Sequence, residues 1–404
     1  MQSAIQSPVA RRLPRNVWAV SLTSFFTDIS SEMVLNLLPL YLSSVLGIRT
    51  NVIGLIEGVA EATASLLKIY SGWLSDRLRG RKWVAVAGYG LSALSKPFFY
   101  FASTWGLIAG VRWADRVGKG IRTSPRDALV ADSVEPGVRG LAFGVQRAFD
   151  TAGAFVGLAV AWWVVRATQA AGATLSAATF QRVVLISIVP GLLAVLILAL
   201  GTRDVPLPER PASAPLRWVS LGRPFLVFLL IAGLFDLGNS SDAFLTLRAQ
   251  ERGASVAGIL GMLLVFNAVY TVIAGPAGSL SDRIGRRRVI VGGWLLYAAV
   301  YLGFALTPGA APLWGLYALY GVYYGMTYGT GKALIADLVS ADLRGTAYGA
   351  YNAVLGLLDL PASLIAGVLW QGAGSWVGFG AAAPFYFGAG TALLAALAFM
   401  LWRR

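Results

Sequence analysis

Long apolar segments recur along the whole chain, and they constrain its fold more than any other feature. Each holds about 20 mostly apolar residues, the length that an α-helix needs to cross a bilayer. Hydrophobic residues make up 57% of the 404 residues, and charged residues only 13%. A spanning segment must pair its backbone polar groups internally, which a helix does along its own length. We therefore predict an all-α integral membrane protein with twelve transmembrane helices.

The predicted spans divide the chain into three parts. They begin near Val17, Asn51, Trp83, Thr104, Gly140, Val183, Arg223, Val256, Val289, Pro312, Gly345 and Pro384. Residues 1–201 form an N-terminal six-helix bundle with a short cytoplasmic tail at 1–16. Residues 202–222, rich in proline and charge, form a cytoplasmic linker. Residues 223–404 form a C-terminal six-helix bundle.

A basic loop motif occurs once in each half. The sequence GWLSDRLRGRK at residues 72–82 returns as GSLSDRIGRRR at residues 278–288. Two shorter matches accompany it: ALVADS at 128–133 with ALIADL at 333–338, and SSE at 30–32 with SSD at 240–242. Such repeats indicate two copies of one unit. We therefore expect the two six-helix bundles to be pseudo-symmetric.

The doubled loop is a candidate conformational latch. An Asp at a helix end, with arginines beside it, can bind the other half in one state and release it in another. The alternative is charge that merely fixes membrane orientation. The latch candidates are Gly72, Asp76, Arg77 and Arg81 in the first copy, and Gly278, Asp282, Arg283 and Arg287 in the second.

The distribution of charge favours a bilayer over nucleic acid as the partner. With both termini in the cytoplasm, most of the 33 Lys and Arg residues fall on the cytoplasmic side, as the positive-inside rule requires. This accounts for the net charge of +14. The first 16 residues lack the apolar core of a signal peptide. We expect a monomeric multi-pass protein of a bacterial inner membrane.

The chain has no Cys and no His. This composition excludes disulfides and thiolate metal sites. A proton relay would have to use carboxylates. We expect neither a metal nor a cofactor.

Ionisable residues within predicted spans are costly and indicate function. They concentrate in the first half, and helical spacing places each set on one face of its helix. We expect those faces to meet in a wet cavity or a buried salt-bridge network. The charged residues are Asp28, Glu32, Glu57, Glu61, Lys68, Lys96, Arg112, Asp115, Arg116, Arg147 and Asp150.

Two functional sets follow from these residues. A carboxylate in a partly dry site can exchange protons near neutral pH, and the proton-coupling candidates are Asp28, Glu32, Glu61 and Arg112. Glu32 is the preferred proton site, with Arg112 as its switching partner; the alternative is a permanent ion pair. The substrate-binding candidates are Asn36, Lys96, Arg116, Arg147, Asp150, Asp236, Asn239, Tyr320, Tyr324 and Asn352. In the structural alternatives, Arg147 pairs with Asp150 and the tyrosines only pack.

The twelve spans, the central linker and the doubled loop together resemble the major facilitator superfamily. This resemblance implies two bundles that alternate access to a central site. Within the superfamily the chain looks most like the twelve-span drug:proton antiporters. Their first-span acid is matched by Glu32 in SSEMVLNLLP, and their fourth-span Arg by Arg112. The chain departs from them at Arg116, where that branch carries glycine.

We therefore expect a secondary transporter that exports a small solute in exchange for protons. The alternative is a carrier of organic anions or phosphorylated metabolites that uses the buried bases. A carboxylate-lined carrier of divalent metal ions is less favoured. An enzyme is not expected, because His, Cys and a nucleophile motif are missing. A sensor would need a soluble domain, and no stretch is long enough for one.

Overall fold

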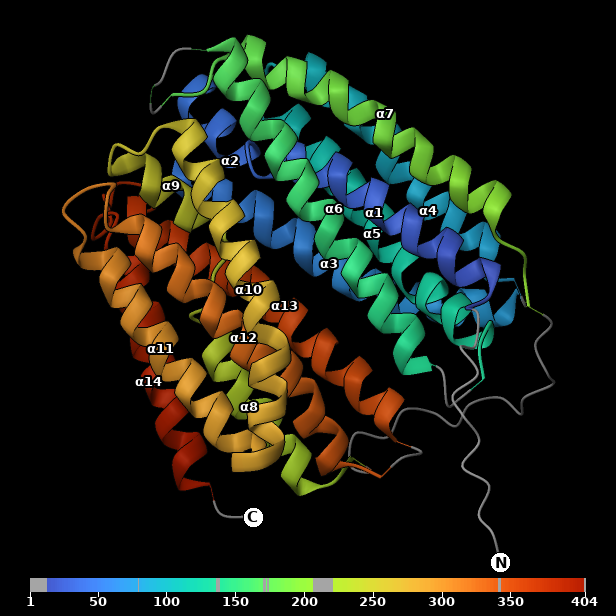
Figure 1. The fold of residues 1–404 in the computed structure, drawn as a ribbon. Coiled ribbons are helices and arrows are strands. Elements are labelled where there is room, and N and C mark those ends of the chain that lie inside the picture. Colours follow the sequence, from blue (N-terminus) through green and yellow to red (C-terminus); the bar gives the residue numbers. More distant parts are fainter. Residues whose placement is uncertain are drawn as a thin grey trace, which may run out of the picture.

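The computed structural model describes residues 13–78, 80–135, 139–169, 172, 174–205, 221–340 and 343–402, and these residues fold almost entirely into helices (Figure 1). The first half holds α1 (Arg15–Leu35), α2 (Leu38–Leu40), α3 (Thr50–Arg77), α4 (Lys82–Ser95), α5 (Trp105–Asp132), α6 (Arg139–Thr168) and α7 (Ala177–Gly201). The second half holds α8 (Arg223–Asp236), α9 (Ala243–Glu251), α10 (Val256–Ile284), α11 (Arg286–Leu306), α12 (Leu313–Leu338), α13 (Arg344–Gln371) and α14 (Ala383–Leu401).

Six of the described helices are long and apolar enough to cross a membrane by themselves: α6, α7, α10, α11, α13 and α14. Helices α1, α3 and α5 carry the charges noted in the sequence, and α4 and α8 have 14 residues each. Large apolar side chains such as Leu230 and Val272 are 75% and 70% exposed, as expected for surfaces that contact lipid. The chain is a helical multi-pass membrane protein; the count of twelve spans remains a prediction.

The sixth predicted span begins earlier than the sequence suggested. Helix α7 starts at Ala177 rather than near Val183. The side chain of Ser176 accepts a hydrogen bond from the backbone N–H of Thr179, which caps the helix at this point. Arg182, which the hydropathy pattern assigns to a loop, therefore lies inside the helix.

The seventh predicted span is not one continuous helix, so Asp236 and Asn239, two of the substrate-binding candidates, do not lie on one helix. Helix α8 ends at Asp236, and the chain resumes as α9 only at Ala243. Between them Gly238 packs against α14, where an added Cβ would lie 1.8 Å from Thr391 Oγ1. The polar residues 239–242 lie in the irregular segment between the two helices.

The two halves lie closest at the end where α2 and α9 meet, which we call the closed end (Figure 1). There Arg49 Nη2 donates to the carbonyl oxygen of Gln371 at 2.8 Å, and Asn51 Nδ2 donates to that of Gly372 at 2.9 Å. Helices α3 and α13 pack so tightly that a Cβ on Gly58 would lie 2.9 Å from Leu360 Cα. The helices diverge towards the opposite end, here called the terminal end, where α1 begins and α14 ends.

Within the first half, α1 packs against α6 through glycines. A Cβ on Gly153 would lie 2.3 Å from the carbonyl oxygen of Phe25, and one on Gly157 would lie 2.6 Å from that of Ile29. Small residues at these two positions let the two helices approach closely.

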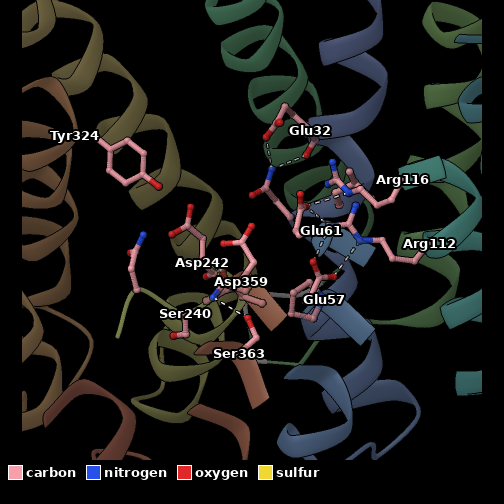
Figure 2. A pocket seen from close by; sticks show the side chains of 17 residues that line it. Glu32, Glu57, Glu61, Arg112, Arg116, Ser240, Asp242, Tyr324, Asp359 and Ser363 are labelled. Carbon is pink, nitrogen blue, oxygen red and sulfur yellow. Dashed lines mark hydrogen bonds and ion pairs between the residues drawn. The ribbon is translucent and has the colours of Figure 1, made fainter. Parts of the chain in front are cut away.

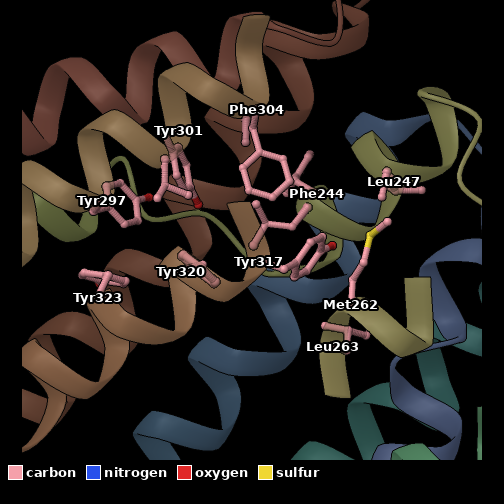
Figure 3. Close-up of a cluster of buried hydrophobic side chains, with 14 of the residues drawn as sticks. Phe244, Leu247, Met262, Leu263, Tyr297, Tyr301, Phe304, Tyr317, Tyr320 and Tyr323 are labelled. Carbon is pink, nitrogen blue, oxygen red and sulfur yellow. The ribbon is translucent and has the colours of Figure 1, made fainter. Parts of the chain in front are cut away.

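Aromatic side chains form much of the core of the second half (Figure 3). Tyr297 and Tyr301 stack with ring centroids 4.0 Å apart, and Tyr323 lies edge-on to Tyr297 at 4.9 Å. Such rings bury large areas and pack with fixed geometry. They give the second half a densely packed aromatic core.

Candidate functional site

A cavity of about 330 Å³ lies between the two halves (Figure 2). Helices α1, α3 and α5 line one side; the segment between α8 and α9, with α9, α12 and α13, lines the other. Its lining residues are Glu32, Leu35, Asn36, Pro39, Glu57, Glu61, Arg112, Arg116, Asn239, Ser240, Ser241, Asp242, Ala243, Thr246, Tyr324, Asp359 and Ser363. A cavity of this volume is large enough for a small solute.

The two bases of the cavity are already paired with acids. Arg112 Nη2 and Nε bind the two carboxylate oxygens of Glu57 at 2.6 and 3.2 Å. Arg116 Nε lies 3.1 Å from Glu61 Oε1, and Arg112 Nη2 lies 3.4 Å from the same oxygen. Two-pronged contacts of this kind are the strongest that a guanidinium makes with a carboxylate. The positive charge on the first-half side is therefore largely neutralised.

Three further acids line the cavity without a cationic partner among the described residues: Glu32, Asp242 and Asp359. Glu32 Oε2 accepts a hydrogen bond from Asn36 Nδ2 at 2.8 Å, and Asp242 Oδ1 accepts one from the Tyr320 hydroxyl at 2.8 Å. Asp359 has no hydrogen bond or ion pair to the described part of the chain. Five carboxylates thus face two guanidinium groups, which leaves an excess of negative charge when all are ionised.

Two of these acids, Glu32 and Asp242, are the last residues of the repeated Ser-Ser-acid triplets at 30–32 and 240–242. Glu32 lies in the last turn of α1, just before that helix ends at Leu35, and Asp242 immediately precedes α9. Asn36 ties the end of α1 to Glu32, since its Nδ2 also donates to the carbonyl oxygen of Glu32 at 2.9 Å. Figure 2 shows Glu32 and Asp242 on opposite sides of the cavity.

The predicted proton-coupling residues are only partly brought together. Glu32, Glu61 and Arg112 line the cavity, whereas Asp28, one turn before Glu32 on α1, does not. Arg112 pairs with Glu57 and not with Glu32, the partner expected from the sequence. The reason is tertiary: α3 packs along α5, so an acid of α3 lies nearest to Arg112. Helical spacing identifies the face of a residue but not the helix opposite it.

The predicted substrate-binding residues are dispersed. Asn36, Arg116, Asn239 and Tyr324 line the cavity. Tyr320 lies behind Asp242 and binds it. Asp236 and Asn352 line a neighbouring cavity instead.

The remaining bases do not assemble into an anion site. Lys96 is 1% exposed and donates to the hydroxyls of Ser30 and Ser31 at 2.8 and 2.9 Å. Arg147 donates to the Tyr270 hydroxyl at 3.2 Å and lies 3.9 Å from Asp150. Neither base reaches the cavity between the halves.

Sequence reasoning counted Glu57 among the charges expected in the interior but gave it no role, and it missed other polar lining residues: Ser240, Ser241, Asp242, Asp359 and Ser363. The match of SSE to SSD pointed to Asp242, but only as a sign of duplication. Ser363 Oγ accepts a hydrogen bond from the backbone N–H of Ser241 at 3.3 Å, so α13 helps to hold the irregular segment.

At the terminal end, the doubled loops make contacts within their own halves. Arg81 binds Ser75 Oγ at 3.0 Å and Asp132 Oδ2 at 3.1 Å. The backbone N–H groups of Arg81 and Lys82 both donate to Asp204 Oδ1 at 2.8 Å. These contacts join the ends of α3, α4, α5 and α7.

In the second loop the counterpart of Arg81 is Arg286, not Arg287 as the sequence alignment suggested. Arg286 binds Ser281 Oγ at 2.7 Å and Asp337 Oδ2 at 3.4 Å, and it pairs with Asp282. Arg287 instead donates to the carbonyl oxygen of Met400 at 2.6 Å. The first loop has one extra residue, which shifts the register after the Asp-Arg pair.

The other latch candidates have varied surroundings. Gly72 lies beside Ser124, and the Arg77 guanidinium lies over the Trp73 ring at 5.4 Å. Gly278 has open space around it, and Arg283 is exposed. The side chain of Asp76 lies outside the described part of the chain. The latch therefore stays a prediction.

Most of this chain matches the family model described as Major Facilitator Superfamily, over residues 20–360 and 243–404. The chain belongs to the major facilitator superfamily. It is similar to the MFS-type transporter MJ1317 of Methanocaldococcus jannaschii, with 36% identity over 368 residues that cover 89% of this chain and 90% of that protein.

Two further proteins are similar to this chain, one in its overall fold and one in the sequence of a shorter segment. The nucleoside transporter NupG has a similar fold, with a TM-score of 0.71, 16% identity and coverage of 96% of this chain and 100% of that one. The multidrug efflux pump LfrA of Mycolicibacterium smegmatis is 34% identical over 122 residues, which are 30% of this chain and 23% of that protein. Membership of the superfamily makes this protein a membrane transporter of small solutes, not an enzyme.

Groups that could hold a metal ion are missing from the part of the chain that the structure describes: no cluster of three or more His, Cys, Asp or Glu side chains has the required arrangement.

Proposed function

We propose that this protein exports a small, positively charged solute in exchange for protons, and that the cavity between the halves is its transport site. The observation that carries the proposal is the excess of carboxylates in that cavity. Glu32, Asp242 and Asp359 lack cationic partners among the described residues, whereas Arg112 and Arg116 are paired. A cation or a proton would supply the missing positive charge.

The proposal also includes which helices span the membrane and which end of the molecule faces the cytoplasm. The twelve spans are α1, α3 to α7, α8 together with α9, and α10 to α14. The terminal end faces the cytoplasm, in line with the basic loops gathered there. In this arrangement the structure is closed on the outside, through contacts such as that of Gly58 with Leu360, and represents a conformation that admits solute from the cytoplasm.

Exchange follows from competition for one site. When Glu32 is ionised, it attracts the solute cation from its side of the cavity; when it is protonated, that attraction is lost and the solute leaves. Alternation of the two halves then couples outward movement of the solute to inward movement of the proton. Glu32 is favoured over Asp28 because Glu32 lines the cavity.

The anion alternative has weaker support. A carrier of organic anions or phosphorylated metabolites needs free bases, and Lys96, Arg112 and Arg147 all bind groups of the protein. The partial similarity to LfrA, a multidrug efflux pump by its printed name, agrees with export as the direction of transport.

A transport assay tests the proposal. The purified protein is reconstituted in proteoliposomes, a pH gradient is imposed, and tetraphenylphosphonium, citrate and glucose 6-phosphate are compared as solutes. We expect an acidic lumen to drive accumulation of the cation, and Glu32→Gln to remove the effect of the gradient. Gradient-driven movement of the anions, without movement of the cation, would overturn the proposal.

A further inference from the structure

A second cavity, of about 240 Å³, lies inside the second half of the chain. Helices α8, α11, α12 and α13 enclose it, and it shares Asn239 and Tyr324 with the cavity between the halves. The proposed exchange mechanism makes no use of this space. We call it the aromatic cavity.

Aromatic rings dominate the lining of the aromatic cavity: seven of its sixteen residues are Phe, Tyr or Trp. Phe235 stacks on Trp294 with centroids 5.0 Å apart, and Phe228 stacks on Tyr351 at 6.0 Å. The rings come from four different helices and are held by one another. Ring faces carry partial negative charge and attract cations, most strongly where water is excluded.

A buried carboxylate lines the same cavity. Asp236, the last residue of α8, is 7% exposed. Its Oδ1 accepts a hydrogen bond from Asn239 Nδ2 at 3.3 Å, and its Oδ2 has no partner among the described residues. A buried carboxylate with one oxygen unpaired and no cation beside it is costly, because one weak hydrogen bond does not replace its lost hydration. The cavity therefore has one place where a positive charge is missing.

The mouth of the aromatic cavity is marked by two exposed residues, Tyr328 and Lys332. Lys332 Nζ lies over the Tyr328 ring at 4.5 Å from its centroid. The lining thus already holds one ammonium group against one of its rings. Because Lys332 is at the mouth, its charge does not pair with the carboxylate of Asp236.

We propose that the aromatic cavity is a binding site for an organic cation with a quaternary or protonated amine. The ammonium group lies between Asp236 and the rings of Trp294 and Tyr323, and the apolar remainder of the ligand packs against Phe228 and Tyr351. This inference rests on the proposed function in one respect: both assume that the solute is positively charged. It adds a site for the cation next to the transport cavity.

Calorimetric titration of the purified full chain tests this site. The probe is benzyltrimethylammonium, and its uncharged carbon analogue neopentylbenzene is the chemical control. We expect the cation to bind at least tenfold more tightly than the analogue. Asp236→Asn, which keeps the shape of the side chain and removes its charge, should weaken cation binding at least tenfold. Asp127→Asn, a partly exposed acid outside both cavities, should leave it within twofold.

A second pair of variants separates the site from general loss of folding. Trp294→Leu removes a ring and should weaken cation binding at least fivefold, whereas Trp294→Phe keeps a ring and should stay within threefold. Unchanged binding in Asp236→Asn would overturn the proposal. A larger loss in Glu32→Gln than in Asp236→Asn would also overturn it, because the cation would then occupy the transport cavity. These titrations measure binding and do not depend on proton coupling. A negative result in the proteoliposome assay would therefore contradict the proposed function without contradicting this binding site.

Discussion

Arg81 and Arg286 make matching contacts in the two halves of the chain. Each binds the serine of its Leu-Ser-Asp-Arg motif and the aspartate of the matching Ala-Leu-x-Ala-Asp motif: Ser75 and Asp132 in the first half, Ser281 and Asp337 in the second. The duplication is therefore preserved in side-chain contacts and not only in sequence. It also identifies Arg286, rather than its neighbour, as the arginine that holds its loop.

The first prediction concerns that arginine. Arg286→Ala should lower the initial transport rate at least tenfold, because a hydrogen bond to a charged group contributes about 1.5–3 kcal/mol. Arg287→Ala, the matched control, loses a contact to one backbone carbonyl and should lose less than threefold. Both rates are measured as solute uptake into proteoliposomes at equal protein content. Equal losses in the two variants would remove the distinction between these arginines.

The second prediction concerns the buried pair of Glu57 and Arg112. Glu57→Gln leaves Arg112 as a buried, partly compensated charge, and removing one partner of such a pair costs about 3–5 kcal/mol. The midpoint of thermal unfolding in detergent should fall clearly. The double variant Glu57→Gln/Arg112→Gln should recover part of the loss.

The control for the buried pair is a more exposed one. Asp127 pairs with Arg126 and is 42% exposed in its side chain. Asp127→Asn should therefore cost less than about 1 kcal/mol. A single Glu57→Gln variant that melts at the same temperature as the Asp127→Asn protein would show that the pair does not stabilise the fold.

The third prediction concerns closure at the α2/α9 end. Gly58→Val places side-chain atoms where Leu360 already lies, so it should oppose packing of α3 on α13. Gly110→Val, at a glycine with open space around it, is the control. The chain has no Cys, so Ser240→Cys provides a single reporter in the transport cavity.

The reporter is labelled with a membrane-impermeant maleimide added at the closed end. We expect at least threefold faster labelling in the Gly58→Val background and no change in the Gly110→Val background. If both backgrounds label at the parent rate, Gly58 does not control closure.

The positions of the helices were predictable from the sequence, because the thickness of a bilayer sets the number of apolar residues that a spanning helix needs. The same argument failed at α8, where the chain breaks after Asp236. Residues 237–242, LGNSSD, are mostly polar, but this stretch is too short to divide a segment that a ruler of about 20 residues counts as one span.

The candidate site was predictable in part for a similar reason. Glu32 and Arg112 were found because each is a charge in an apolar span, but their partners depend on which helices are neighbours. Asp242 was missed because it lies in the break and not in a span. Its echo of Glu32 in the Ser-Ser-acid triplet was the one available signal.

The central claim is that Glu32 carries the exchanged proton, and proton release on solute binding tests it most directly. The purified protein is held in weakly buffered detergent solution at pH 7, tetraphenylphosphonium is added, and released protons are followed with a pH indicator dye. The account predicts release from the parent protein and from Asp28→Asn, and none from Glu32→Gln. Undiminished release from Glu32→Gln would contradict it.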